Sequence, residues 1–96
     1  MHASIWRFTG DPDALLAGYD ALAAEMPADA LLVHLALRTP DGMIIVDTCP
    51  TEEAWRAFSS GPEFAAMLAR HGLTDPVIED HPVHRAVAST AAAAAA

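Results

Sequence analysis

Two strand-like runs joined by a turn occupy residues 31–49, which read LLVHLALRTPDGMIIVDTC. Residues 31–38 and 43–49 are rich in aliphatic side chains, as expected of strands. Between them, Pro40 suits a type I turn and Gly42 suits the left-handed residue that completes a three-residue loop. The stretch therefore predicts an antiparallel hairpin, and the loop length sets its register.

The predicted loop places Thr39 opposite Met43, which divides the hairpin side chains between two faces. One face carries the pairs Leu37 with Ile45, Leu35 with Asp47 and Val33 with Cys49; the other carries Arg38 with Ile44, Ala36 with Val46 and His34 with Thr48. A shift of one residue would change this division. On the predicted register, Asp47 lies among apolar side chains and His34 lies on the opposite face.

Upstream of the hairpin, the chain predicts a strand followed by a helix. Residues 2–9 form a strand-like run that stops at Gly10. Asp11 is placed to cap the next helix, and Pro12 fits its first turn, where a missing N–H has no cost. An apolar stripe at helical spacing follows and ends at Pro27; its members are Leu15, Leu16, Tyr19, Leu22, Ala23 and Met26.

Downstream of the hairpin, the sequence predicts a helical region in two parts and a last strand. Thr51 can cap a helix, and residues 60–63, Ser-Gly-Pro-Glu, offer a second start for a helix that Gly72 closes. Residues 76–87 then read as a strand interrupted at Pro82, which indicates an edge strand or a bulge.

The resulting order, β-α-β-β-α-β, predicts a ferredoxin-like α+β fold. Right-handed crossovers place both helical regions on one face of a four-stranded antiparallel sheet. The other face is left bare and partly apolar, so two copies are expected to pack face to face as a homodimer. Residues 1–88 form the single predicted domain, and residues 89–96 form a disordered Ala-rich tail.

Composition excludes several classes of chemistry and partner. The chain has no Lys, Asn or Gln, which removes Schiff-base and P-loop lysines and N-glycosylation sites. Its net charge is −8 and its five Arg are scattered, so nucleic acid and anionic membranes are not expected partners. With one cysteine, no apolar stretch of about 20 residues and no signal-peptide pattern, we expect a cytoplasmic protein.

The chain resembles the dimeric α/β-barrel proteins, namely the antibiotic-biosynthesis monooxygenase-like and stress-responsive A/B barrel groups. The resemblance lies in the element order, the opening His-Ala-Ser-Ile-Trp-Arg-Phe of residues 2–8, the Thr-Glu-Glu-Ala-Trp of residues 51–55, and Phe64. It implies a homodimer without a bound cofactor. The family includes cofactor-free oxygenases, polyketide cyclases, haem degraders and proteins of no known activity, so fold alone does not give the chemistry.

The same resemblance implies a small pocket between the helices and the sheet of each subunit. The positions that match its lining here are His2, Ser4, Trp6, Tyr19, Asp47, Cys49, Trp55, Phe58 and Leu68. The haem-degrading branch is set aside, because the chain has no Asn and Leu68 stands where that branch has a histidine. The cyclase branch is disfavoured, because Met43 replaces its strand histidine.

Asp47 is the residue most suggestive of catalysis. On the helix-covered face, burial would favour its neutral form and make it a candidate general base or acid, helped by His81 or Tyr19. The alternative is structural, since Asp47 lies close to the turn at residues 49–51 and can hydrogen bond there.

Other titratable residues have weaker functional interpretations. His81 and His84 are three apart, which places them on opposite faces of a strand, so a metal site is not expected. His81 alone, in phase with Val77 and Val83, could reach the pocket side, and the alternative is a solvated or edge histidine. His34 is interpreted as a residue of the dimer interface, and His71 as a group stabilised by a helix C-terminus. Cys49 is interpreted as a small buried side chain rather than a nucleophile.

Two hypotheses follow. The first is a cofactor-free enzyme, of the oxygenase or proton-transfer type, that acts on an aromatic or polyketide-like molecule through Asp47, His81 and Tyr19. The second is a non-catalytic ligand-binding or structural homodimer with a filled pocket. A cavity of roughly 300 Å³ beside Asp47 would favour the first, and a closed core of Trp6, Tyr19 and Phe58 would favour the second.

Overall fold

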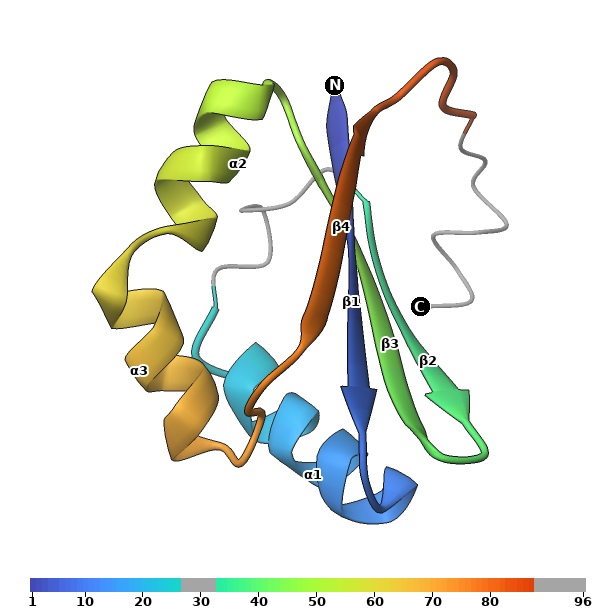
Figure 1. The fold of residues 1–96 in the computed structure, drawn as a ribbon, viewed down its shortest axis with the longest axis vertical. Helices are drawn as coiled ribbons and strands as arrows, with labels where there is room; N and C mark the ends of the chain where they lie inside the picture. The colour runs from blue at the N-terminus through green and yellow to red at the C-terminus, as the bar shows by residue number, and fades with distance from the viewer. Residues whose placement is uncertain (27–32, 88–96) are drawn as a thin grey trace.

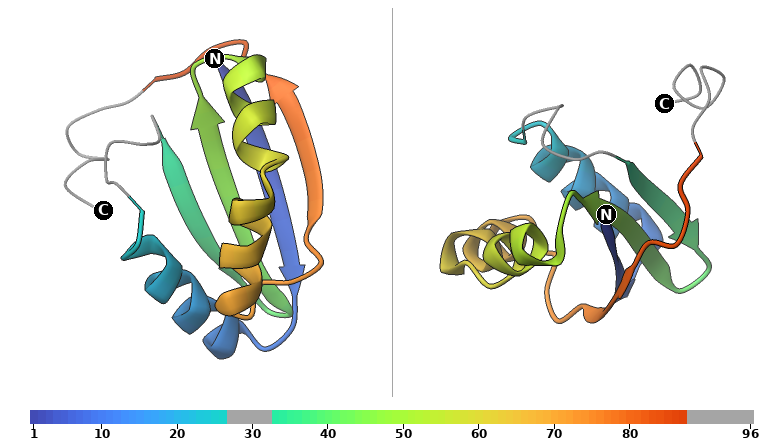
Figure 2. Two further views of the ribbon diagram at one scale, coloured as in Figure 1. Left: turned by 90° about the vertical axis from the view of Figure 1, so that its left-hand side faces the viewer. Right: turned by 90° about the horizontal axis from the view of Figure 1, so that it is seen from above.

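The computed structural model describes residues 1–26 and 33–87, and within them four antiparallel strands form one sheet (Figure 1). The strands are β1 (His2–Thr9), β2 (His34–Thr39), β3 (Gly42–Cys49) and β4 (Val77–Pro82), in the order β2-β3-β1-β4. The helices α1 (Pro12–Ala23), α2 (Glu52–Ser59) and α3 (Pro62–Arg70) all cover one face of the sheet (Figure 2). This arrangement confirms the ferredoxin-like α+β fold.

Local signals in the sequence account for the helix boundaries. The Asp11 carboxylate accepts a hydrogen bond from the backbone N–H of Ala14 at 3.1 Å, and the Thr51 hydroxyl accepts one from Ala54 at 3.0 Å. Each bond satisfies an N–H that the first turn of a helix leaves without a partner. The helical region is interrupted after α2 and begins again as α3 at Pro62, as the Ser-Gly-Pro-Glu segment predicts.

The hydrophobic core lies between the helices and the sheet. Every second residue of β1 from His2 to Phe8 is buried against the helices, and β3 alternates in the same way from Met43 to Asp47, after which Thr48 and Cys49 are both buried. Leu15 and Leu22 of α1 and Leu68 of α3 close this layer from the other side. His71 caps α3 and contacts Glu25, which follows α1, so it has the structural position predicted for it.

The predicted hairpin register was wrong by one residue. Thr39 pairs with Gly42 rather than Met43, so the loop consists of Pro40 and Asp41 alone. As a result β2 is turned over: His34 lies beside Asp47 on the helix-covered face, and the residues predicted there, Leu35 and Leu37, lie on the outer face. The faces of β3 are as predicted, because β1 pairs with β3 along its whole length.

The register makes the outer face of the sheet more apolar than predicted. Leu35 is 51% exposed and Val77 is 69% exposed, although both side chains are aliphatic. Half-buried aliphatic side chains lie between them on the inner strands; they are Ile5, Ile44 and Val46. We refer to these residues, with Val33 and Leu37, as the outer apolar face.

Part of the sequence interpretation falls outside the described residues, including Pro27 and the tail at residues 89–96. Across residues 1–26 and 33–87, no helix is both long enough and apolar enough to cross a bilayer. The single-domain boundary and the cytoplasmic location stay predictions.

Candidate functional site

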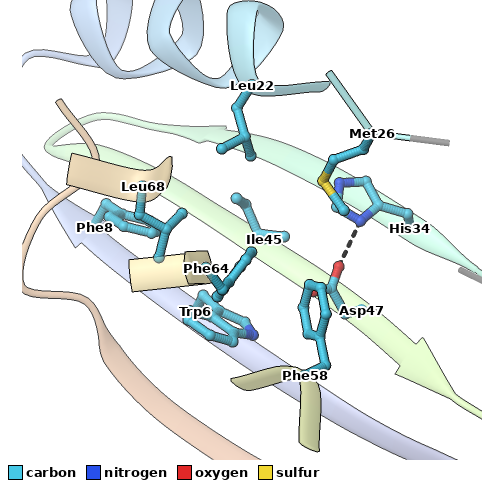
Figure 3. A pocket seen from close by; sticks show the side chains of 10 residues that line it. All are labelled: Trp6, Phe8, Leu22, Met26, His34, Ile45, Asp47, Phe58, Phe64 and Leu68. Atoms are coloured by element: carbon cyan, nitrogen blue, oxygen red, sulfur yellow. Dashed lines mark ion pairs between the residues drawn. The ribbon is translucent and has the colours of Figure 1, made fainter. Parts of the chain in front are cut away.

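Two titratable side chains meet on the helix-covered face of the hairpin. Nδ1 of His34 lies 2.5 Å from Oδ1 of Asp47, its partner across the β2–β3 ladder (Figure 3). Asp47 is 5% exposed. The two atoms lie within ion-pair distance, but the contact does not have the geometry of a regular hydrogen bond, and neither atom has another hydrogen-bond partner among the described residues. Burying a carboxylate with a single imidazole partner costs folding free energy. Such an arrangement therefore marks a candidate functional site.

Thr48 fixes the position of His34 along the hairpin. Its hydroxyl accepts a hydrogen bond from the N–H of Val33 at 2.7 Å and donates one to the Val33 carbonyl at 3.1 Å. The two bonds hold the residue before His34 to the end of β3. Thr48 therefore positions the imidazole that contacts Asp47.

Tyr19 of α1 covers the other side of His34. The two rings are stacked, with centroids 5.5 Å apart and planes 11° from parallel. Partial burial raises the pKa of Tyr19, and the negative charges of Asp47 and Asp20 raise it further. Tyr19 therefore stays a neutral phenol at ordinary pH.

The shift at Tyr19 gives a direct test of the charge on Asp47. Because the chain has one Tyr, phenolate absorbance reports on Tyr19 alone. We expect Asp47→Asn to lower the pKa of Tyr19 and Asp20→Asn to lower it less, since Asp47 contributes more to the shift. Equal titration curves for Asp47→Asn and the wild-type protein would contradict a charged Asp47 near this ring.

An apolar pocket adjoins the pair. Its lining residues come from every layer of the fold, and they are Trp6, Phe8, Leu22, Met26, His34, Ile45, Asp47, Phe58, Phe64 and Leu68 (Figure 3). The open space is about 20 Å³, which is room for about one water molecule. His34 and Asp47 are the ionisable groups of this lining, so one end of the pocket is charged and the rest is apolar.

The structure brings together part of the predicted site. The lining of the pocket includes Trp6, Asp47, Phe58 and Leu68. Tyr19 does not line the pocket itself, but its ring stacks on that of His34, which does. Ser4 is fully buried and accepts a hydrogen bond from Nε1 of Trp6 at 2.8 Å, so it orients the indole ring.

His81 does not reach the pocket, so its catalytic position was wrong, and the alternative of a solvated histidine on an edge strand fits the structure. It pairs with Ala3 on the outer face of the sheet, its side chain is 67% exposed, and it contacts Glu79. His81 is in phase with Val77, as expected, but both residues pair with outer-face residues of β1, so the error lay in the face assigned to this strand.

The remaining predicted residues form a separate corner at the start of β1. His2 pairs with Cys49 across the β1–β3 ladder, and its ring lies 5.6 Å from that of Trp55. Burial raises the pKa of the Cys49 thiol, and the charge of Asp47 raises it further, which is unfavourable for a nucleophile. The structural interpretation of Cys49 therefore fits its surroundings.

The same corner holds a group of side chains with metal-binding chemistry. Ligand atoms of His2, Glu52 and Asp80 lie within 4.8 Å of one another. His2 already contacts Asp80 at 2.6 Å, and Arg56 donates two hydrogen bonds to Glu52 at 3.1 and 2.6 Å. These contacts satisfy the group as ion pairs, so it gives no independent sign of a metal.

His34 is the titratable residue of this site that sequence reasoning missed, because it was assigned to the dimer interface; the apolar lining residues Phe8, Leu22, Met26, Ile45 and Phe64 were also not predicted for the pocket. Its position depends on the hairpin register and on nothing in its immediate sequence. The alternative role for Asp47 at the 49–51 turn is not seen, since Thr51 caps α2 and Asp47 contacts His34.

Together, fold and site define a class: a small ferredoxin-like domain with an apolar pocket between helices and sheet and an imidazole–carboxylate pair at one end. Solved structures of similar fold include a putative antibiotic biosynthesis monooxygenase from Deinococcus radiodurans, with a TM-score of 0.64 and 15% identity over 93% of this chain and 98% of that one. Rv0793 from Mycobacterium tuberculosis has a TM-score of 0.64 and 22% identity over 90% and 98% of the two chains. SnoaB, a cofactor-independent oxygenase from Streptomyces nogalater, has a TM-score of 0.65 and 18% identity over 92% and 97%.

These neighbours confirm the suspected fold of the antibiotic-biosynthesis monooxygenase-like proteins. No family model and no curated protein matches the sequence. At identities this low the likeness concerns the fold, and the chemistry must be argued from the residues.

Proposed function

We propose that this chain is a small-molecule enzyme that removes a proton from an aromatic or polyketide-like substrate without a bound cofactor. The observation that carries the proposal is the pair formed by the half-buried His34 and the buried Asp47, 2.5 Å apart at the polar end of an apolar pocket. The fold shared with a cofactor-independent oxygenase supports it. Apolar pockets with a few converging polar groups are the usual form of small-molecule sites.

The pair has the arrangement of a base and its orienting group. With Nδ1 facing the carboxylate, a neutral His34 carries its proton on Nδ1 and keeps the lone pair on Nε2. Figure 3 shows this second nitrogen on the side of Met26. Nε2 would accept the substrate proton, and Asp47 would stabilise the imidazolium that forms. In chemistry of the oxygenase type, the resulting anion would itself supply electrons to oxygen.

A second function is favoured by one observation, the cavity volume. At about 20 Å³, the pocket is far below the roughly 300 Å³ that a small-molecule ligand occupies. Trp6 and Phe58 both border this space, as a closed core requires. A non-catalytic homodimer with a filled pocket is therefore the alternative.

Ligand retention separates the two functions. We would purify the native protein and identify small molecules released on denaturation by mass spectrometry. The enzyme hypothesis predicts an aromatic molecule with an acidic hydroxyl or C–H group, retained by the wild-type protein and reduced in Asp47→Asn. If nothing is retained and no member of a panel of phenols binds, the enzyme hypothesis is contradicted and the filled pocket is favoured.

We further propose that two copies associate through the outer apolar face. Leu35, Leu37 and Val77 are exposed there, and an apolar patch of this kind on a soluble protein indicates an interface. Arg7 and Glu79 form an ion pair at 3.2 Å on the β1–β4 side of this face, where Arg7 lies between Ile44 and Val77, so the apolar surface is continuous over β2 and β3 and becomes polar toward β4.

Leu35→Glu is expected to weaken this association. Each dimer would lose two buried leucines and gain two buried charges, so we expect the dissociation constant to rise by about tenfold or more. Sedimentation velocity over a range of concentrations measures it. Val87→Glu, which changes an exposed apolar residue outside the sheet, serves as the control. A dimer equally stable in both variants would place the interface elsewhere.

A further inference from the structure

A second, more open space lies next to the pocket beside His34 and Asp47. A groove lies over the junction of α2 and α3, with an open volume of about 330 Å³. Its lining residues are Ala57, Phe58, Gly61, Glu63, Phe64 and Met67. Unlike the inner pocket, it is large enough for a small aromatic molecule.

Two residues line both spaces. Phe58, near the end of α2, and Phe64, in the first turn of α3, border the inner pocket and also the groove. Their rings are 4.3 Å apart and inclined at 44°. The pocket and the groove are therefore separated by this pair of rings, and Figure 3 shows both rings at the edge of the inner pocket.

The position of this pair favours movement. Both rings are only partly buried, and they flank the Ser60–Gly61 break, where the helix is interrupted. Gly61 provides no side-chain cap for α3. Rotation of partly exposed side chains is fast and needs no rearrangement of the sheet.

We propose that the α2–α3 groove is the entrance to the pocket, and that the side chains of Phe58 and Phe64 form a gate between the groove and the pocket. When the two rings rotate apart and the gate is open, the groove and the pocket join into one cavity of ligand size that reaches from solvent to His34 and Asp47. This inference rests on the proposed function, and it explains how a pocket of about 20 Å³ admits a substrate.

The charges along this route define the ligand. Glu63 is the ionisable residue of the groove lining, and the chain has a net charge of −8, so both disfavour an anion at the entrance. The pocket beyond is apolar up to His34 and Asp47. The ligand class is therefore a flat aromatic molecule that enters with its acidic hydroxyl neutral and ionises only beside the pair.

The test uses 2-naphthol as the neutral probe and naphthalene-2-sulfonate as its permanently anionic counterpart. Trp6 lines the pocket, so entry of the probe quenches tryptophan fluorescence, and stopped-flow mixing gives the association rate. We expect Ala57→Phe, which fills the groove, to lower this rate by about tenfold or more. Phe58→Leu, which replaces one ring of the gate by a smaller side chain, should raise the association rate. Naphthalene-2-sulfonate should bind at least about tenfold more weakly than 2-naphthol.

Ala54→Phe is the matched control, because Ala54 is an exposed residue of α2 that lines neither space. Equal rates for Ala57→Phe and Ala54→Phe would place the entrance elsewhere, and no quenching in the wild-type protein would also overturn the proposal. Failure of the proposed function has a different signature: the probe enters and Ala57→Phe slows it, but Asp47→Asn leaves the ionisation of bound 2-naphthol unchanged.

Discussion

Asp47→Asn is expected to lower turnover of a substrate by about a hundredfold to ten-thousandfold, the usual contribution of general acid–base catalysis. The amide is close in shape to the carboxylate but carries no charge. The amide oxygen can still take the place of Oδ1, which lies 2.5 Å from Nδ1 of His34. The neutral amide no longer stabilises the imidazolium that forms when Nε2 accepts a proton. The expected loss is in kcat, because the charge matters most after proton transfer has begun.

Asp20→Asn is the matched control for this experiment. Asp20 is an exposed acid on α1 that, like Asp47, raises the pKa of Tyr19, but it has no contact with His34 among the described residues. Removing its charge tests the general effect of lost negative charge near the site. Full turnover by Asp47→Asn, or equal losses in both variants, would eliminate the proposed role of the pair. His34→Gln should resemble Asp47→Asn, since the two residues act as one unit.

Most of the fold could be predicted because its signals are local. The cap at Asp11, the Pro at the first turn of α1 and the restart at Pro62 each depend on residues within one helical turn. The alternation along β1 is similarly visible in the sequence. Elements whose boundaries depend on near neighbours were predicted closely, and the crossover rule then assembled them into a sheet.

The candidate site was predicted only in part, because it depends on the pairing of two strands. Asp47 was placed correctly from the alternation of β3, which β1 fixes on one side. His34 was placed on the wrong face, because a shift of one residue moves every side chain of β2 to the other face. The error also exchanged alternate residues of β2 between the two faces, which is why the outer face is more apolar than predicted.

The ambiguity lies in Gly42, which has two uses in a hairpin. A glycine after Pro-Asp can be the left-handed residue of a three-residue loop, as the sequence analysis assumed. It can also be the first residue of the strand, at a place where another backbone approaches too closely for a side chain. The structure shows the second use: the residues with positive φ among those described are Gly10, Gly72 and Asp75, and Gly42 pairs with both Thr39 and Thr9.

Gly42→Ala is therefore expected to destabilise the fold strongly. A Cβ atom at this position would lie 1.9 Å from the carbonyl oxygen of Phe8 and 2.9 Å from its carbonyl carbon. Both are backbone atoms of β1, a central strand, so no side-chain rotation relieves the clash. We expect a loss of about 3 kcal/mol or more in the free energy of unfolding, the upper range for overpacking. Urea denaturation measures it.

Gly61→Ala is the control, because its Cβ would meet its nearest neighbours at 3.7 and 3.8 Å, an ordinary contact distance. We expect that variant to change stability by less than about 1 kcal/mol. A Gly42→Ala protein as stable as Gly61→Ala would mean that β1 and β3 are not held this closely. The register that brings His34 to Asp47 would then lose its physical cause, because the carbonyl of Phe8 is what requires a glycine in the strand and leaves Pro40 and Asp41 as the whole loop.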